Sequence, residues 1–149
     1  MLTKKGKYGL KAMVHLAGRE PGKPCLVSDI AEQNGIPKKF LDTILGELKN
    51  AGFLHSKKGK GGGYVLGRPA SEIRVGHIVR VLDGPLAPIP CASKTRYQPC
   101  DDCDVATCQI RHMMLDVRNA IAEVLDKTSL AQLRDSTGDL LDDEIKQPA

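Results

Sequence analysis

Tryptophan is absent from this sequence of 149 residues, which contains only two phenylalanines and three tyrosines. Proteins that bind single-stranded nucleic acid stack its bases on several aromatic side chains, so that class of protein is poorly supported. No stretch approaches the roughly 18 consecutive apolar residues of a membrane-spanning helix. The N-terminal residues also lack the apolar segment of a signal peptide. We therefore expect a soluble, cytoplasmic protein with no membrane partner.

Charge is divided unevenly between the two halves of the chain. Residues 1–68 contain 13 lysines and arginines and 5 acidic residues, a net charge of +8, whereas residues 69–149 contain 9 and 13, a net charge of −4. A strongly basic half favours a polyanionic partner. With so few aromatic residues, duplex DNA fits this half better than a single strand.

Three helices are predicted in the first 52 residues. The apolar residues over about 4–17 have the spacing of one helix face, and Ser28 is placed to cap a short second helix that stops at Asn34-Gly35. Pro37 suits the first turn of a third helix, whose apolar stripe extends from Phe40 to Leu48. A short helix, a glycine-containing turn and a longer helix form a helix-turn-helix, whose second helix enters the major groove.

A β-hairpin is predicted next. Residues 53–58 and 64–66 have the composition of short strands, and the glycine-rich turn between them, Gly59 to Gly63, permits positive φ angles. After a helix motif this hairpin is the expected wing. The predicted fold class is mainly α with a small β-hairpin: a winged helix-turn-helix followed by a long C-terminal helix.

The rest of the chain divides into three segments. A further helix ending at Asp83-Gly84-Pro85 closes a winged-helix domain at residues 1–83, and a proline-broken, cysteine-rich loop follows over 84–107. We assign residues 108–135 to a dimerisation helix and its end, and residues 136–149 to a disordered acidic tail. The long helix is predicted from about Val105 to Thr128, because an apolar seam with coiled-coil spacing needs a partner helix. That seam contains Ile110, Met114, Val117, Ile121 and Val124.

The DNA contacts are expected on the first helix, the third helix and the wing. Lysines there would neutralise phosphates, and a few side chains on the third helix would contact bases. The candidates are Lys4, Lys5, Lys38, Lys39, Asp42, Thr43, Lys58, Lys60, Gly61, Gly62 and Tyr64. Helix-turn-helix shapes also occur in domains that bind no DNA, which leaves a protein-interaction module as an alternative. A nucleotide-binding phosphate loop is excluded, because Lys60 precedes a glycine and the turn leads into a strand.

Cysteines cluster in the second half. Cys91, Cys100, Cys103 and Cys108 lie within 18 residues of a chain without an export signal, so metal binding is a better interpretation than structural disulfides. Thiolates of this kind hold either zinc or an iron-sulfur cluster, and a thiol-redox switch is a third possibility. His112, four residues after Cys108, is a weaker candidate ligand. Cys25 stands apart and is expected to be a buried apolar residue.

No arrangement typical of catalysis is present, so an enzyme is not predicted. The order of motifs instead resembles the winged-helix family of the iron-sulfur cluster regulator (IscR-like, Rrf-type) over about residues 1–135. The matching motifs are Tyr8-Gly9-Leu10, Ile30-Ala31-Glu32, Gly35-Ile36, Leu41 to Leu48, Ala51-Gly52-Phe53-Leu54 and Gly59 to Leu66.

This resemblance implies a homodimer joined through the long helix and, in cluster-binding members, three loop cysteines that hold an iron-sulfur cluster. Cys91 and Cys108 match the outer two, and we expect both Cys100 and Cys103 to belong to the site. Where the iron-sulfur regulator has a histidine three residues after its last cysteine, this chain has Arg111. A [2Fe-2S] and a [4Fe-4S] cluster are therefore not distinguished. Other members lack the cysteines and serve cysteine metabolism.

The leading hypothesis is a dimeric transcription regulator, a repressor of iron, iron-sulfur or redox and nitrosative-stress genes, that binds promoter DNA under control of the cluster. Structural zinc or a thiol switch in the same loop are the alternatives. The sequence leaves open the operator, the target genes, which form binds DNA, and repression versus activation.

Overall fold

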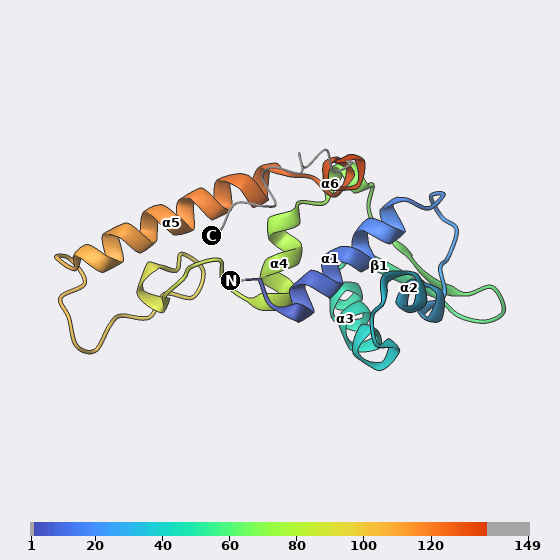
Figure 1. The fold of residues 1–149 in the computed structure, drawn as a ribbon, viewed down its shortest axis with the longest axis horizontal. Coiled ribbons are helices and arrows are strands. Elements are labelled where there is room, and N and C mark those ends of the chain that lie inside the picture. Colours follow the sequence, from blue (N-terminus) through green and yellow to red (C-terminus); the bar gives the residue numbers. More distant parts are fainter. Residues whose placement is uncertain (1, 137–149) are drawn as a thin grey trace, which may run out of the picture.

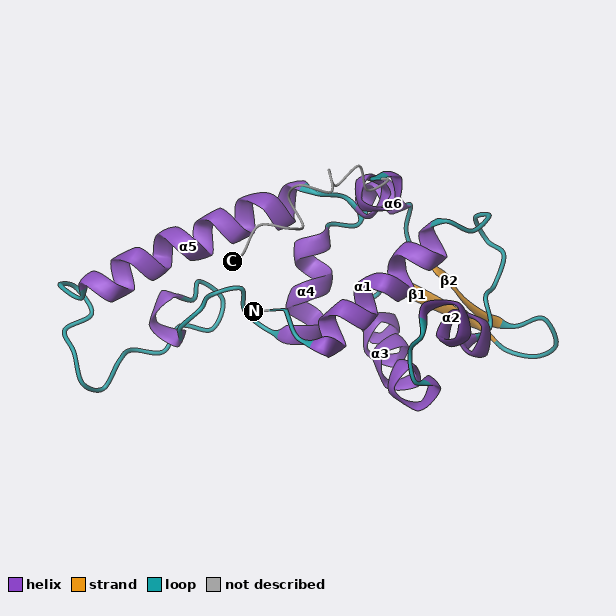
Figure 2. Cartoon of the chain, in the orientation of Figure 1, coloured by secondary structure: helices purple, strands orange, loops and turns teal. Residues whose placement is uncertain are grey.

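The computed structural model describes residues 2–136, and helices dominate it (Figures 1 and 2). The predicted tail residues 137–149 lie outside the described residues. The α-helices are α1 (Lys4–Ala17), α2 (Val27–Asn34), α3 (Lys38–Asn50), α4 (Val75–Asp83), α5 (Gln109–Lys127) and α6 (Leu130–Asp135). Strands β1 (Leu54–Lys57) and β2 (Gly63–Leu66) form an antiparallel hairpin, and single 3₁₀ turns occur at Ala70–Glu72 (η1) and Pro90–Ala92 (η2). The predicted fold class is confirmed.

One core unites α1, α2, α3, α4 and α6. Its fully buried large side chains are Met13, Ile30, Leu41, Ile44, Leu45, Leu48, Leu54, Ile73, Ile78 and Leu130. The stripe predicted on the third helix faces this core, except that Phe40 stays 36% exposed and packs edge-on against Tyr8 instead. Cys25 is buried in the core, as expected of a small apolar residue.

Several predicted boundaries were wrong in detail. Leu26, not Ser28, occupies the N-cap of α2, and Ser28 lies in its first turn. The long helix begins at Gln109 rather than Val105, because Cys108 caps it with its side chain. Helix α6 was not predicted as a separate element, although Ser129 and Gln132 form a capping box at its start.

The hairpin is joined to the segment before α2. Backbone hydrogen bonds run both ways between Cys25 and Tyr64 at 2.9 Å, so residue 25 extends the sheet by one bridge. Gly63 lies beside this bridge with a φ of 143°, and a Cβ atom there would lie 2.1 Å from the Cys25 carbonyl oxygen. Only glycine fits both the backbone angle and the close approach.

We expect Gly63→Ala to lower the free energy of unfolding by about 2 kcal/mol, because strained backbone and a backbone clash both oppose the folded state. Urea unfolding followed by circular dichroism measures this change. Gly46→Ala is the matched control: this glycine lies inside α3 with no atom within 4 Å of the new Cβ. It should stabilise the protein slightly, since alanine is the better helix former. Equal stability of the two variants would contradict the packing described for the wing.

Helix α5 projects away from the winged-helix body, and residues 84–108 form a loop alongside it (Figure 1). Along α5 the exposed large apolar residues are Ile110, Met113, Val117 and Val124. Of the predicted seam, Ile110, Val117 and Val124 are exposed in the single chain, whereas Met114 and Ile121 are half-buried.

Candidate DNA interface and cysteine centre

The helix-turn-helix is formed by α2, a turn at Gly35 and α3. Gly35 adopts left-handed backbone angles (φ 63°, ψ 38°), which end α2 and reverse the chain. The next residue, Ile36, is buried and donates its N–H to the Ala31 carbonyl at 2.9 Å. The turn is thus fixed from both sides, and α3 is held at a defined angle to α2.

The first turns of α3 present polar side chains to solvent. Lys38, Lys39, Asp42 and Thr43 are all exposed, while the intervening Leu41 is fully buried. Lys38 and Asp42 form an ion pair with a nitrogen–oxygen distance of 3.4 Å. All four sequence-predicted residues of this helix therefore lie on one exposed face, which is free to contact a groove.

Predicted wing residues fall into two groups. Lys58, Lys60 and Gly61 are exposed at the tip of the hairpin. Gly62 is buried and donates its N–H to Gly59 at 3.0 Å, and Tyr64 is half-buried in strand β2. The tip therefore offers two lysines for phosphates, while the geometry gives Gly62 and Tyr64 the role of shaping the wing.

The two predicted lysines of α1 also differ. Lys4 is exposed, whereas Lys5 is half-buried and forms an ion pair with Glu47 of α3 at 2.7 Å. This pair ties α1 to α3. Lys5 is thus committed to an internal contact rather than presented to solvent.

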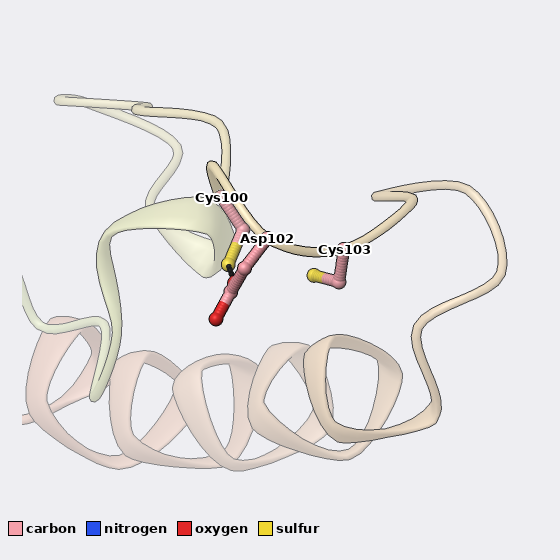
Figure 3. Close-up of side chains that lie close together, drawn as sticks. All are labelled: Cys100, Asp102 and Cys103. Atoms are coloured by element: carbon pink, nitrogen blue, oxygen red, sulfur yellow. Dashed lines mark hydrogen bonds between the residues drawn. The ribbon is translucent and has the colours of Figure 1, made fainter.

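The cysteine loop brings donor groups together at the start of α5 (Figure 3). The ligand atoms of Cys100, Asp102 and Cys103 all lie within 4.8 Å of one another, and the Cys100 thiol donates to an Asp102 carboxylate oxygen at 2.7 Å. These groups are exposed or half-exposed. A metal held there would be accessible from solvent.

Cys108 is the next thiol along the loop. The neighbouring Cys100 thiol, and to a lesser extent Cys108, raises the pKa of Cys103 to about 12. Conversely, the pKa of Cys108 is lowered, chiefly because its sulfur accepts the backbone N–H of Arg111 at 3.5 Å at the N-terminus of α5. The thiolate is the form that binds metals, so the helix terminus prepares Cys108 as a ligand.

The other two predicted ligands are placed differently. Cys91 is buried in η2, outside the Cys100–Asp102–Cys103 group, and its carbonyl oxygen accepts a hydrogen bond from the Arg111 side chain at 2.9 Å. His112 directs Nε2 to the Ala106 carbonyl at 3.2 Å rather than to a thiol. Arg111 therefore links both ends of the loop: its backbone supports Cys108 and its side chain anchors Cys91.

This donor set suits a soft metal. Thiolates are the preferred ligands of zinc and of iron-sulfur clusters, and the nearby carboxylate can complete either type of site. The fit rests on the group formed by Cys100, Asp102 and Cys103, together with the lowered pKa of Cys108 at the N-terminus of α5. No comparable gathering of histidine, cysteine and carboxylate ligands occurs elsewhere in residues 2–136.

Helix α5 is fastened to the winged-helix body by Arg80 of α4. Its guanidinium donates two hydrogen bonds to Asp126, at 2.6 and 2.8 Å. Gly76 lies directly beneath, where a Cβ atom would approach the Asp126 carboxylate to within 1.9 Å. The pair thus connects the helix that begins at the cysteine centre to a helix of the DNA-binding domain. This pair was not predicted, because two oppositely charged residues 46 positions apart give no local signal in the sequence.

We expect Asp126→Asn to destabilise the protein by about 1 kcal/mol near neutral pH. The effect is smaller than for a buried ion pair, because both side chains are partly exposed to solvent. Arg80 lowers the pKa of Asp126 below its ordinary value of 3.8. The carboxylate therefore stabilises the fold above pH 3.8, and this contribution is lost as the pH falls through the lower folded-state pKa. Denaturant unfolding from pH 7 downward should show the wild type and the variant converging in acid. A constant difference would contradict the ion pair, and Asp116→Asn, on the exposed part of α5, should change little.

A search for membrane-spanning helices within residues 2–136 finds none with the necessary length and apolarity. The exposed face of α3, the lysine-tipped hairpin and their order along the chain define the class: a winged helix-turn-helix domain that binds DNA. The sequence model described as "Rrf2: Iron-dependent Transcriptional regulator" matches residues 2–136. The chain belongs to the Rrf2 family of transcriptional regulators, which are DNA-binding proteins rather than enzymes.

Known relatives extend over nearly the whole chain. An rrf2-like HTH-type transcriptional regulator of Rhodobacter capsulatus is 39% identical over 137 residues, which cover 89% of this chain and 91% of the relative. The HTH-type transcriptional regulator IscR of Serratia proteamaculans is 33% identical over 132 residues, covering 89% and 77%. The family resemblance found in the sequence is confirmed.

Solved structures agree with the fold. CymR, described as the global cysteine regulator of B. subtilis, superposes with a TM-score of 0.76 at 34% identity, covering 93% of this chain and 98% of CymR. IscR of T. potens gives a TM-score of 0.71 at 30% identity, covering 100% and 93%. The family thus includes a regulator named for cysteine as well as IscR.

Proposed function

We propose that this regulator senses iron, iron-sulfur status or a redox or nitric oxide signal through an iron-sulfur cluster in the cysteine loop. The observation that carries the proposal is the gathering of Cys100 and Cys103 beside Asp102, in the loop that leads to Cys108 at the N-cap of α5. A regulator that used its loop only as a spacer would not need two thiols and a carboxylate gathered within 4.8 Å of one another. The IscR relatives support the same cofactor.

The thiols of Cys100, Cys103 and Cys108 would bind the cluster directly, and Asp102 and Cys91 are the two candidates for the fourth ligand. Asp102 already contacts Cys100. Arg111 holds the Cys91 backbone beside the first turn of α5. Such a cluster supplies redox- and nitric oxide-sensitive iron. The protein's own part is to hold the thiolates near solvent and to connect them to α5.

The Arg80–Asp126 pair gives the route by which loop changes reach the DNA-binding domain. Rearranged thiols would displace Cys108 and with it the first turn of α5. At the other end of that helix, Asp126 is bound to α4, which packs against α1 and α3 of the DNA-binding domain. We propose that cluster loss alters DNA affinity by shifting this helix relative to the winged helix.

For DNA, we propose that α3 enters the major groove through Lys38, Lys39, Asp42 and Thr43, with Lys4 of α1 and Lys58, Lys60 and Gly61 of the wing contacting phosphates. Lys5, Gly62 and Tyr64 would act indirectly by fixing the surfaces on which these residues lie. A regulator of genes acts where the DNA is, so we also propose a cytoplasmic location. We further propose that the protein represses its promoter.

A homodimer is the proposed binding form. The apolar side chains of α5 that face solvent are 61% (Ile110), 53% (Met113), 38% (Val117) and 64% (Val124) exposed in the single chain. They recur at helical spacing along one side of a helix that projects from the body. Pairing this face with a second copy would bury it and place two recognition helices on one operator.

The proposal is tested by purifying the protein without oxygen, recording its visible absorption spectrum and measuring iron, sulfide and zinc. We expect a coloured protein with iron and acid-labile sulfide bound in stoichiometric amounts. A colourless protein with one zinc per chain would establish the second candidate, a structural zinc site, which the contact of Asp102 with Cys100 favours. A colourless protein without metal would favour the third alternative, a thiol-redox switch in the same loop.

A further inference from the structure

A groove on the winged-helix domain has no role in the function proposed above. Its volume is about 450 Å³, within the range of small-molecule sites. The end of α1, the loop of residues 18–24, the end of β2 with the loop after it, and Arg134 of α6 form its walls. In the view of Figure 1, α6 and the loop after α1 lie above α1, whereas α3 lies below it. The groove therefore lies away from the DNA-reading helix.

Basic side chains outnumber acidic ones along this groove. Lys23 is paired with Glu20 at 3.9 Å, and Arg134 is paired with Asp135 at 2.8 Å. Arg19 and Arg68 line the groove from different walls, and within residues 2–136 neither has a carboxylate within 4.0 Å. Within the described residues, the groove thus carries two guanidinium groups that form no ion pair.

Arg68 is held in place. Its guanidinium carbon lies 5.1 Å from the centre of the Phe53 ring, a cation–π contact that restrains the group. Between the cations the lining is apolar: Leu16, Ala17 and Val65 are all buried. An apolar floor with guanidinium groups at its edges is complementary to an apolar molecule that carries an acid group.

Hydrogen bonds join the walls of the groove to the wing and to each other. Lys57 of β1 donates to the Gly22 carbonyl at 3.1 Å, and Arg134 donates to the Ala17 carbonyl at 3.1 Å. A molecule bridging Arg19 and Arg68 would tie the loop after α1 to the base of the hairpin. It would thereby restrict the wing, which contacts DNA at its other end.

We propose that this groove binds a small organic carboxylate, which bridges Arg19 and Arg68 and acts on DNA binding through the wing. By thermodynamic linkage, operator DNA then changes the affinity for the carboxylate by the same factor as the carboxylate changes the affinity for DNA. This site goes beyond the proposed cysteine-based sensing and does not depend on it.

The experiment is isothermal titration of the full-length protein with benzoate, hexanoate and succinate, each compared with its uncharged amide and with inorganic phosphate. At least one carboxylate should bind with a Kd of about 1 mM or tighter. Arg19→Ala and Arg68→Ala should each weaken it about tenfold, since each removes charge-assisted hydrogen bonds. Lys49→Ala, an exposed cation outside the groove, is the control.

Three results would overturn the proposal: no carboxylate binding, equal binding of the amide or of phosphate, or unchanged binding in the Arg19→Ala/Arg68→Ala protein. If the double variant loses DNA affinity when no carboxylate is present, the two arginines contact DNA phosphates. That result would also contradict the proposal of a carboxylate site. Titration of the Cys103→Ala protein separates this site from the cysteine centre, because carboxylate binding should survive there.

Discussion

Replacing Cys103 with alanine is expected to reduce the iron that copurifies with the protein by at least about tenfold and to abolish its visible absorption. The Cys103 thiol is the shared neighbour of Cys100 and Cys108, so its removal separates the remaining two donors. Oxygen-free purification followed by iron analysis and absorption spectroscopy measures both effects. Circular dichroism should show the fold retained, because Cys103 is exposed and contributes nothing to the core.

Cys25→Ala is the matched control for this experiment. Cys25 is buried in the winged-helix core, far along the chain from the loop, so its removal should cost some stability and leave the iron content unchanged. Comparing Asp102→Ala with Cys91→Ala then identifies the fourth ligand. Full iron content in Cys103→Ala would contradict the assignment of the site.

Val117→Asp is expected to convert a dimer into a monomer and to lower operator affinity by about 100-fold or more, since the second half-site would no longer be bound together with the first. Val117 lies in the middle of the exposed apolar face of α5, where a carboxylate in an interface would be desolvated without a partner. Light scattering after gel filtration reports the mass, and a fluorescence anisotropy titration reports the affinity.

Asn119→Asp provides the control, because it introduces the same charge two positions along α5, on a different side of the helix. That variant should remain dimeric. A wild-type protein that is monomeric at micromolar concentration, or a dimeric Val117→Asp protein, would show that the exposed face of α5 serves another purpose.

Local chemistry made much of the fold predictable. The Asn34-Gly35 sequence signals a left-handed helix end, and the structure has that turn at Gly35. The run Gly59 to Gly63 signals a hairpin turn, and the strands pair on either side of it. Helix starts were less predictable: at α5 a cysteine takes the N-cap position, where serine, threonine and aspartate are the usual residues.

The candidate site was predictable in its residue types but not in its contacts. Four clustered cysteines indicated a metal, yet only the folded loop shows that Cys100 and Cys103 lie beside Asp102 while Cys91 is buried in η2. Likewise, a run of lysines cannot show that Lys5 is paired with Glu47. Such contacts depend on residues distant in sequence, and no periodicity encodes them.

We propose that the state of the cysteine centre sets the affinity for DNA. The direct measurement is operator binding by the oxygen-free protein before and after its iron is removed with a chelator, at one fixed salt concentration. We expect the affinity to change by at least about fivefold, the lower end of typical allosteric coupling, and Cys103→Ala to match the iron-free protein. Equal affinity of the iron-loaded and iron-free forms would contradict it.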